Sequence, residues 1–244
     1  MNLIIDIGNT FTKIAVFQEA TLLQKQQAIT ADTTRLIKEV LQNFPKIERS
    51  ILAAVADVSQ STLEVLQKNT KLLLLNAQTK VPFANNYHSQ GSLGIDRIAL
   101  AAASVAQFPK RNVLVIDAGT CITYDLIEKD AIYQGGSISP GIKMRYLALH
   151  NFTAKLPLLN KETFEVNNFP AKTTVENIHL GVVQGVIFEI DGFINQYKNQ
   201  FSNLTVIFTG GDAEFLSKKV KNSIFVPQNF LLQGLNHILE YNNI

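Results

Sequence analysis

Residues 3–10 read LIIDIGNT, and they decide the fold because their pattern occurs twice in the chain. An apolar run ends in Asp-Ile-Gly-Asn-Thr, and residues 12–17 follow with β-branched and apolar side chains. Gly and Asn tolerate the positive φ of a tight turn, so the pattern predicts two strands joined as a hairpin. The same order returns as an apolar run at 113–116, Asp-Ala-Gly-Thr at 117–120 and a second predicted strand at 122–127.

This repeat predicts a duplicated α/β fold. Asp6 and Asp117 are 117 − 6 = 111 residues apart, which is the scale of a domain. Each half is predicted to form a twisted mixed sheet with helices on its faces. We place the boundary near residues 109–112, which gives an N-terminal domain of residues 1–111 and a C-terminal domain of residues 112–244.

Hydrophobic spacing predicts the other elements. Apolar residues recur at helical spacing in 33–44, and Ser61 followed three residues later by Glu64 is typical of a helix N-cap. Residues 81–93 are polar and rich in turn formers, which indicates a surface loop. The remaining predicted helices are 61–68, 96–107, 175–199 and one after 210–212, and the remaining strands are 50–55, 72–75 and 205–208.

The composition is that of a folded protein without a charge field for nucleic acid. The chain has 244 residues, of which 46% are hydrophobic and 17% charged, and its formal net charge is +2. Cys121 is the one cysteine, so no internal disulfide or cysteine-ligated zinc site is expected. The N-terminus lacks the basic flank of a signal peptide, and no stretch approaches the roughly 20 apolar residues that span a bilayer. We therefore expect a cytoplasmic protein with no membrane or nucleic-acid partner.

Both glycine loops carry groups that suit a phosphate. Glycine lets backbone N–H groups approach an anion without a Cβ in the way. In the first loop Thr10 and Thr12 add hydroxyl donors, Lys13 adds a positive charge, and Asp6 could hold a hydrated magnesium ion. Either loop alone could be an ordinary turn whose polar side chains satisfy the backbone. Two such loops facing each other could clamp a polyphosphate, so the repetition favours phosphate binding.

Two further motifs concern the nucleoside and the phosphoryl acceptor. Residues 207–213, IFTGGDA, run from a predicted strand through Gly-Gly into a helix, where a flat ring or a phosphate can approach the backbone. The alternative is a tight turn in which Asp212 caps the helix. Residues 94–97, GIDR, begin a predicted helix, where Asp96 could accept a proton and Arg97 could bind a carboxylate or phosphate. The alternative is that Asp96 only caps this helix.

Together the two loops and residues 207–213 resemble the ATPase superfamily of actin, Hsp70 chaperones and sugar kinases. This resemblance implies a duplicated ribonuclease-H-like (actin-like ATPase) fold with two mixed sheets flanked by helices. The full ordered set of motifs resembles the type III pantothenate kinase family. It comprises DIGNT at 6–10, GIDR at 94–97, DAGT at 117–120, GGSISPG at 135–141, AKLP at 154–157, residues 174–181 and TGGDA at 209–213.

The family resemblance implies a reaction and a role for each matched residue. The γ-phosphoryl of ATP would pass to the primary hydroxyl of pantothenate, giving 4'-phosphopantothenate in the first step of coenzyme A biosynthesis. Asp96 would accept the hydroxyl proton, Asp117 would bind potassium or ammonium, and Asp6 would hold magnesium through water. The implied ATP contacts are Asp6, Ile7, Gly8, Asn9, Thr10, Phe11, Thr12, Lys13 and Thr120, and the implied substrate contacts are Tyr87, Gly94, Ile95, Asp96, Arg97 and Thr174. A homodimer is also implied, with Thr174 reaching the substrate across the interface.

Two alternatives stay open. A sugar or acetate kinase of the same superfamily would use the same ATP loops. A non-enzymatic regulatory accessory factor on this scaffold is the other alternative. A pure binding module needs no general base, so the presence of Asp6, Asp96 and Asp117 favours an enzyme.

Overall fold

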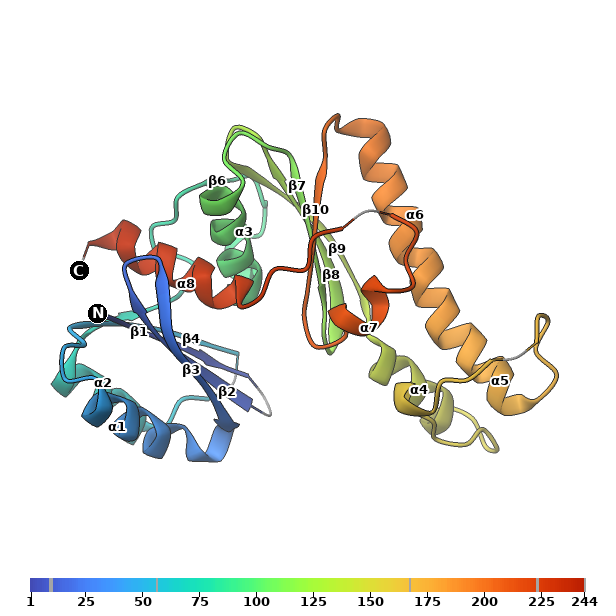
Figure 1. Ribbon diagram of the computed structural model, residues 1–244, viewed down its shortest axis with the longest axis horizontal. Helices are drawn as coiled ribbons and strands as arrows, with labels where there is room; N and C mark the ends of the chain where they lie inside the picture. Colours follow the sequence, from blue (N-terminus) through green and yellow to red (C-terminus); the bar gives the residue numbers. More distant parts are fainter. Residues whose placement is uncertain (9–10, 56, 167, 223, 244) are drawn as a thin grey trace. The chain divides into compact units, whose positions relative to one another are not determined.

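The computed structural model describes residues 1–8, 11–55, 57–166, 168–222 and 224–243 (Figure 1). It divides into two compact units. The first unit comprises Met1–Lys110, Ala131–Tyr133 and Asn229–Ile244, and the second comprises Arg111–Asp130 and Gln134–Gln228. The division of the sequence into duplicated halves, 1–111 and 112–244, stays a prediction.

The sheet of the first unit has the strand order β3-β2-β1-β4-β5. Its centre is the predicted hairpin, β1 (Asn2–Ile7) and β2 (Phe11–Gln18), which pair antiparallel. The edge strand β3 (Thr21–Ile29) continues this antiparallel order, whereas β4 (Arg49–Ala54) pairs parallel with β1, and β5 (Lys71–Leu74) pairs parallel with β4. The sheet is therefore mixed, as the repeat predicted.

Alternation along β1 divides its side chains between two layers. Leu3, Ile5 and Ile7 point to the layer of α1 (Thr33–Asn43) and α2 (Gln60–Asn69), where they form one core with Leu36, Ile37, Val40 and Leu66. Helix α2 begins at Gln60, one residue earlier than predicted, and its N-cap lies two residues earlier. Its N-cap is Ser59, whose Oγ accepts from the Thr62 N–H at 3.3 Å, so the expectation of Ser61 as N-cap was wrong.

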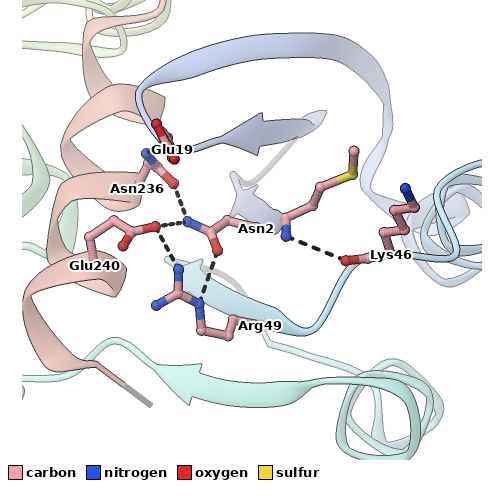
Figure 2. Close-up of polar contacts among 7 residues, drawn as sticks. Asn2, Glu19, Lys46, Arg49, Asn236 and Glu240 are labelled. Carbon is pink, nitrogen blue, oxygen red and sulfur yellow. Dashed lines mark hydrogen bonds and ion pairs between the residues drawn. The ribbon is translucent and has the colours of Figure 1, made fainter.

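The other face of β1 is held by the C-terminal helix α8 (Phe230–Asn242), which also packs against α3 (Ile95–Gln107). Buried Asn2 donates to Asn236 at 2.8 Å and to Glu240 at 2.5 Å, and Figure 2 shows these bonds. Arg49 on β4 completes the network, donating to Asn2 at 3.1 Å and to Glu240 at 2.7 Å. Polar bonds between buried groups fix the register of α8 on the sheet.

The second sheet has the order β10-β7-β8-β9-β6. It repeats the start of the first sheet, because β7 (Val113–Ala118) pairs antiparallel with β8 (Cys121–Glu128) and parallel with β10 (Thr205–Thr209). Strand β9 (Ile132–Pro140) contains the glycine motif 135–141 except for its last residue. At its start, Ile132 and Tyr133 pair with the short strand β6 (Ala84–Asn85) within the first unit.

One long helical segment covers the second sheet. It runs through α5 (Thr174–His179), a π-helical turn at Leu180–Gln184 and α6 (Gly185–Gln200), and its buried side chains share a core with α4 (Ile142–Asn151) and α7 (Ala213–Ser217). Among the described residues this is the one helix long and apolar enough to cross a membrane. Its residues Val183, Val186, Ile190 and Ile194 are buried in that core, so it is a core helix.

Candidate active site

Asp6, at the end of β1, is a largely buried carboxylate, with 19% of its side chain exposed. It lies directly opposite Lys13 on β2, and the lysine Nζ is 4.0 Å from Asp6 Oδ2. Burial raises the pKa of Asp6; Lys13 opposes this shift and the Asp96 carboxylate adds to it. A cation near this pair of acids would stabilise the ionised forms.

No group of three or more His, Cys, Asp or Glu side chains suited to a metal occurs among the described residues. Magnesium is usually held by one or two carboxylates together with waters and substrate phosphates. Asp6 therefore fits a hydrated magnesium ion better than a site built from protein ligands alone.

The turn after β1 is tied to its surroundings through Gly8. The Gly8 N–H donates to the Phe11 carbonyl at 3.0 Å, and the Thr30 hydroxyl donates to the Gly8 carbonyl at 2.9 Å. Two predicted ATP contacts in this turn, Asn9 and Thr10, lie outside the described residues. Thr12 is buried, and its hydroxyl shares a 2.6 Å hydrogen bond with Thr33. That hydroxyl thus joins β2 to α1, and its predicted contact with ATP stays a prediction.

Asp96 occupies the first turn of α3 without being its N-cap. Gly94 holds the N-cap position, and Asp96 Oδ1 accepts from the Arg97 N–H at 2.8 Å. A Cβ on Gly94 would lie 2.5 Å from the same oxygen, so a larger residue at position 94 would displace the Asp96 carboxylate. Asp96 is thus not the N-cap residue, but its carboxylate still binds a first-turn N–H of α3, so its predicted role as a base stays a prediction. Asp96 also lies close enough to Asp6 to influence its titration.

Arg97 is held against two tyrosine rings. Arg97 is buried, with 6% of the residue exposed. Its guanidinium carbon is 5.6 Å from the centre of the Tyr87 ring and 6.0 Å from the centre of the Tyr133 ring. Such stacking fixes the plane of a guanidinium that can bind a carboxylate through two bonds. The structure thus brings the predicted Tyr87, Gly94, Asp96 and Arg97 together in the first unit. Tyr133 was missed, because no spacing along the chain relates it to Arg97.

In the second unit three glycine motifs meet at the end of β7. Gly210 has φ +97°, and a Cβ there would lie 2.4 Å from both Asp117 Oδ1 and the Ala118 carbonyl. The Asp212 N–H donates to that carbonyl at 2.9 Å, and the Gly141 N–H donates to the Thr120 carbonyl at 3.0 Å. Three motifs that are separate in the sequence therefore form one structural site: residues 117–120, 135–141 and 209–213.

The surroundings of Asp117 are suited to a cation. Asp117 lies opposite Thr123 in the β7–β8 pair, so both side chains are on one face of the sheet. Thr123 Oγ1 is buried and has no hydrogen-bond partner within the described part of the chain. A buried hydroxyl oxygen without a partner, beside a carboxylate, could coordinate a monovalent cation.

A cavity of about 680 Å³ opens beside this meeting point. Its wall is mostly apolar, and Thr120, Lys161 and Asp212 supply polar groups. Asp212 stands at the N-cap position of α7, but its carboxylate makes no cap bond and instead accepts from Lys161 Nζ. The alternative of a turn with Asp212 as N-cap is therefore right about the position of this residue, but its side chain does not cap the helix. The apolar lining residues are Ile142, Tyr146, Leu147, Leu158 and Leu159. Size and lining suit a nucleoside.

Thr174, the last predicted substrate contact, is exposed at the first position of α5 in the second unit. Its neighbour Thr173 is the N-cap and forms a capping box with Glu176, accepting from the Glu176 N–H at 3.2 Å. The Thr173 hydroxyl thus has a structural task at the start of the helix, which leaves Thr174 as the better candidate for a ligand.

Comparison with known proteins identifies the family of this chain. The family model of type III pantothenate kinase matches residues 2–196. Type III pantothenate kinases of Christiangramia forsetii and Flavobacterium johnsoniae are 47% and 44% identical, covering 99% of this chain and 99% and 98% of their own.

Solved structures show the same fold. A Campylobacter jejuni protein described as a conserved Baf family transcriptional activator has a TM-score of 0.63 at 25% identity, covering 99% of this chain and 98% of its own. A glucokinase from an Antarctic psychrotroph has a TM-score of 0.53 at 12% identity, with 98% of each chain covered. These likenesses confirm the predicted actin-like ATPase fold, with two mixed sheets flanked by helices. The chain belongs to the type III pantothenate kinase family.

Proposed function

We propose that this chain transfers the γ-phosphoryl group of ATP to the primary hydroxyl of pantothenate, the first step of coenzyme A biosynthesis. The observation that carries this proposal is the arrangement at the start of α3, where Asp96 stands beside the stacked Arg97. A general base next to a fixed carboxylate-binding group suits a substrate that has both a hydroxyl and a carboxylate. Pantothenate has both groups.

Asp96 accepts the hydroxyl proton in this proposal. Phosphoryl transfer has a loose transition state, so positioning and charge neutralisation contribute most of the catalysis, and the proton leaves late. The N-terminus of α3 stabilises a negative charge at this position through the helix dipole. Arg97 binds the substrate carboxylate, and Tyr87, Gly94 and Ile95 line the same pocket.

The proposed ATP contacts are found in each unit by itself. Asp6, the Gly8 turn and Lys13 contribute phosphate and magnesium contacts from the first unit. Thr120 contributes a hydroxyl from the second unit, where the cavity bounded by Lys161 and Asp212 suits the nucleoside. A magnesium ion held through water by Asp6 supplies positive charge for the phosphate oxygens.

Potassium or ammonium is proposed to bind at Asp117. The carboxylate and the unpartnered Thr123 oxygen would share its coordination, and the ion would add positive charge near the phosphates.

A homodimer is proposed in which Thr174 reaches the substrate of the other subunit. Exposed apolar side chains on the long helix support an interface there: Val175 is 44% exposed and Phe188 is 61% exposed. A cytoplasmic location, with no membrane or nucleic-acid partner, fits a biosynthetic enzyme that acts on small molecules.

The test is a direct assay of the purified chain with ATP, magnesium and a panel of acceptors: pantothenate, acetate, glucose and N-acetylmannosamine. We expect ADP release and a phosphorylated product with pantothenate alone. Phosphorylation of a sugar or of acetate instead would overturn the substrate assignment. No turnover with any acceptor would favour the non-enzymatic alternative, which the likeness to a protein described as a transcriptional activator keeps in view.

The same assay run in potassium, ammonium or sodium chloride tests the cation. Activity in the first two salts and little in sodium is expected. Equal rates in all three would remove the monovalent cation from the mechanism.

A further inference from the structure

The carboxylate of Glu189, on α6, collects hydrogen bonds from three other elements. Tyr124 on β8 donates to Oε1 at 2.9 Å, and Ser139 on β9 donates to the same oxygen at 2.5 Å. Arg145 on α4 donates to Oε2 at 2.6 Å. Less than a quarter of each charged side chain is exposed, 21% for Arg145 and 23% for Glu189. This network joins α4, α6 and two strands of the second unit through side-chain hydrogen bonds.

The electrostatics show that these bonds hold the glutamate ionised. Burial alone would raise the pKa of Glu189, but the bonds from Arg145, Ser139 and Tyr124 outweigh it and the pKa is lowered. The pKa of the Tyr124 hydroxyl is raised, first by burial and then by the negative charge of Glu189. Both shifts indicate a charged acceptor with neutral and cationic donors around it.

The same network reaches the glycine turn that supports the second phosphate loop. Arg145 Nε donates to the Pro140 carbonyl at 2.8 Å, so Ser139 and Pro140 are both bound to the Arg145–Glu189 pair. The next residue, Gly141, donates to the Thr120 carbonyl at 3.0 Å. Three consecutive residues thus connect the ion pair to Thr120.

The Ser139–Gly141 turn packs tightly against the loop that carries Thr120. A Cβ on Gly141 would lie 2.2 Å from the Gly119 carbonyl and 2.5 Å from the Thr120 carbonyl. Packed backbones at this spacing move together. A displacement of Pro140 would therefore displace Thr120, which borders the cavity suited to the nucleotide.

We propose that Glu189 is a positioning residue for ATP, acting through Arg145 and the Ser139–Gly141 turn to fix the loop that carries Thr120. The proposal rests on the proposed function in taking ATP as the ligand of that loop. Two apolar side chains of similar size would fill the same space without the cost of burying charge. The ion pair is therefore better explained by the geometry it imposes on the turn than by stability.

The test compares three variants by two measurements. Calorimetry gives the Kd for ATP in the absence of pantothenate, and steady-state kinetics gives kcat and the KM for each substrate. Glu189→Gln is expected to raise the Kd and KM for ATP about tenfold or more while the KM for pantothenate stays unchanged. Glu240→Gln is the control, because the Arg49–Glu240 pair in the first unit has a similar distance, 2.7 Å, with side chains 25% and 37% exposed. It is expected to lower the urea midpoint with no change in ATP affinity.

The double variant Glu189→Met with Arg145→Met separates positioning from folding. It leaves no unpaired buried charge, so its urea midpoint should recover toward that of the wild type, while ATP binding should stay weak because Pro140 has lost its anchor. Full ATP affinity in either Glu189 variant would overturn the proposal, as would an equal loss of affinity in Glu240→Gln. If the wild type binds ATP but does not phosphorylate pantothenate, the calorimetric comparison still decides the role of Glu189.

Discussion

Gly234, in the middle of α8, allows that helix to cross α3 at very short range. A Cβ added to Gly234 would lie 1.9 Å from the Ala99 carbonyl oxygen, 2.8 Å from the Ala99 carbonyl carbon and 3.1 Å from the Ala103 Cβ. The first two are backbone atoms of α3, so no side-chain rotation can relieve the overlap. Gly234→Ala should therefore force the two helices apart.

The size of the effect follows from these distances. A Cβ rarely approaches a heavy atom closer than 3.0 Å, so the helices must separate by at least 3.0 − 1.9 = 1.1 Å at this crossing. Overpacking of a core costs about 1–3 kcal/mol, and a backbone clash belongs to the upper part of that range. Alanine regains up to about 1 kcal/mol because it is the better helix former. We expect a net loss of about 2 kcal/mol in the free energy of unfolding.

The assay is urea unfolding followed by circular dichroism, with Gly192→Ala as the control. Gly192 also lies inside a helix, α6, but a Cβ there would meet nothing within 4 Å. That variant should gain about 0.4–1 kcal/mol, so the two glycine-to-alanine changes should have opposite signs. Because α3 carries Asp96 on its first turn, kcat should also fall in Gly234→Ala. A midpoint for Gly234→Ala at or above that of the wild type, with Gly192→Ala stabilised as expected, would refute the reasoning.

Three other substitutions test the candidate site. Asp96→Asn should lower kcat by about 10²–10⁴-fold with ATP affinity retained, and near wild-type turnover would remove Asp96 as the base. Burial raises the pKa of Asp6, so its ionised carboxylate lowers the free energy of unfolding at neutral pH. This cost disappears as the pH falls from the raised pKa to the ordinary value of 3.8. Asp6→Asn should therefore lose activity yet raise the urea midpoint at neutral pH, with the gain shrinking toward pH 3.8; a constant gain would contradict the burial argument. Lys161→Met should weaken ATP binding, because it breaks the contact with Asp212 at the cavity; unchanged binding would place the nucleoside elsewhere.

The sequence predicted the elements whose signal is local and failed where the signal is tertiary. The hairpin of β1 and β2, helix α3 and strand β10 have clear apolar periods, and the structure confirms them. Strand β3 was missed because TLLQKQQAI is an edge strand with no fully buried residue, and pairing with β2 alone makes it a strand. Helix α8 was missed as well. Glycine in mid-helix weakens the local preference, and Gly234 is there for the contact with α3.

Strand β9 is another element that depends on tertiary packing. It was not among the predicted elements, and a Cβ on its Gly136 would lie 1.5 Å from the Tyr124 carbonyl, so this glycine belongs to close strand packing. Within the candidate site the matched motifs were found because each is continuous in sequence. Tyr133 is 133 − 97 = 36 residues from Arg97, and Glu189 is 65 residues from Tyr124. Such partners become visible only when the chain has folded.

The two proposed ion sites lie at similar strand ends. Asp6 and Asp117 each occupy the next-to-last position of a strand, β1 and β7, and each is followed by a glycine whose N–H closes a turn, Gly8 to Phe11 and Gly119 to Cys121. The neighbours differ. Opposite Asp6 stands a lysine, with a second carboxylate nearby, which is a charged setting for a hydrated divalent ion and phosphate. Opposite Asp117 stands a buried threonine hydroxyl, an uncharged oxygen that could share a cation with the carboxylate. The strand ends are similar in the two units, so the residue across each hairpin is what distinguishes the proposed magnesium site at Asp6 from the proposed monovalent-cation site at Asp117.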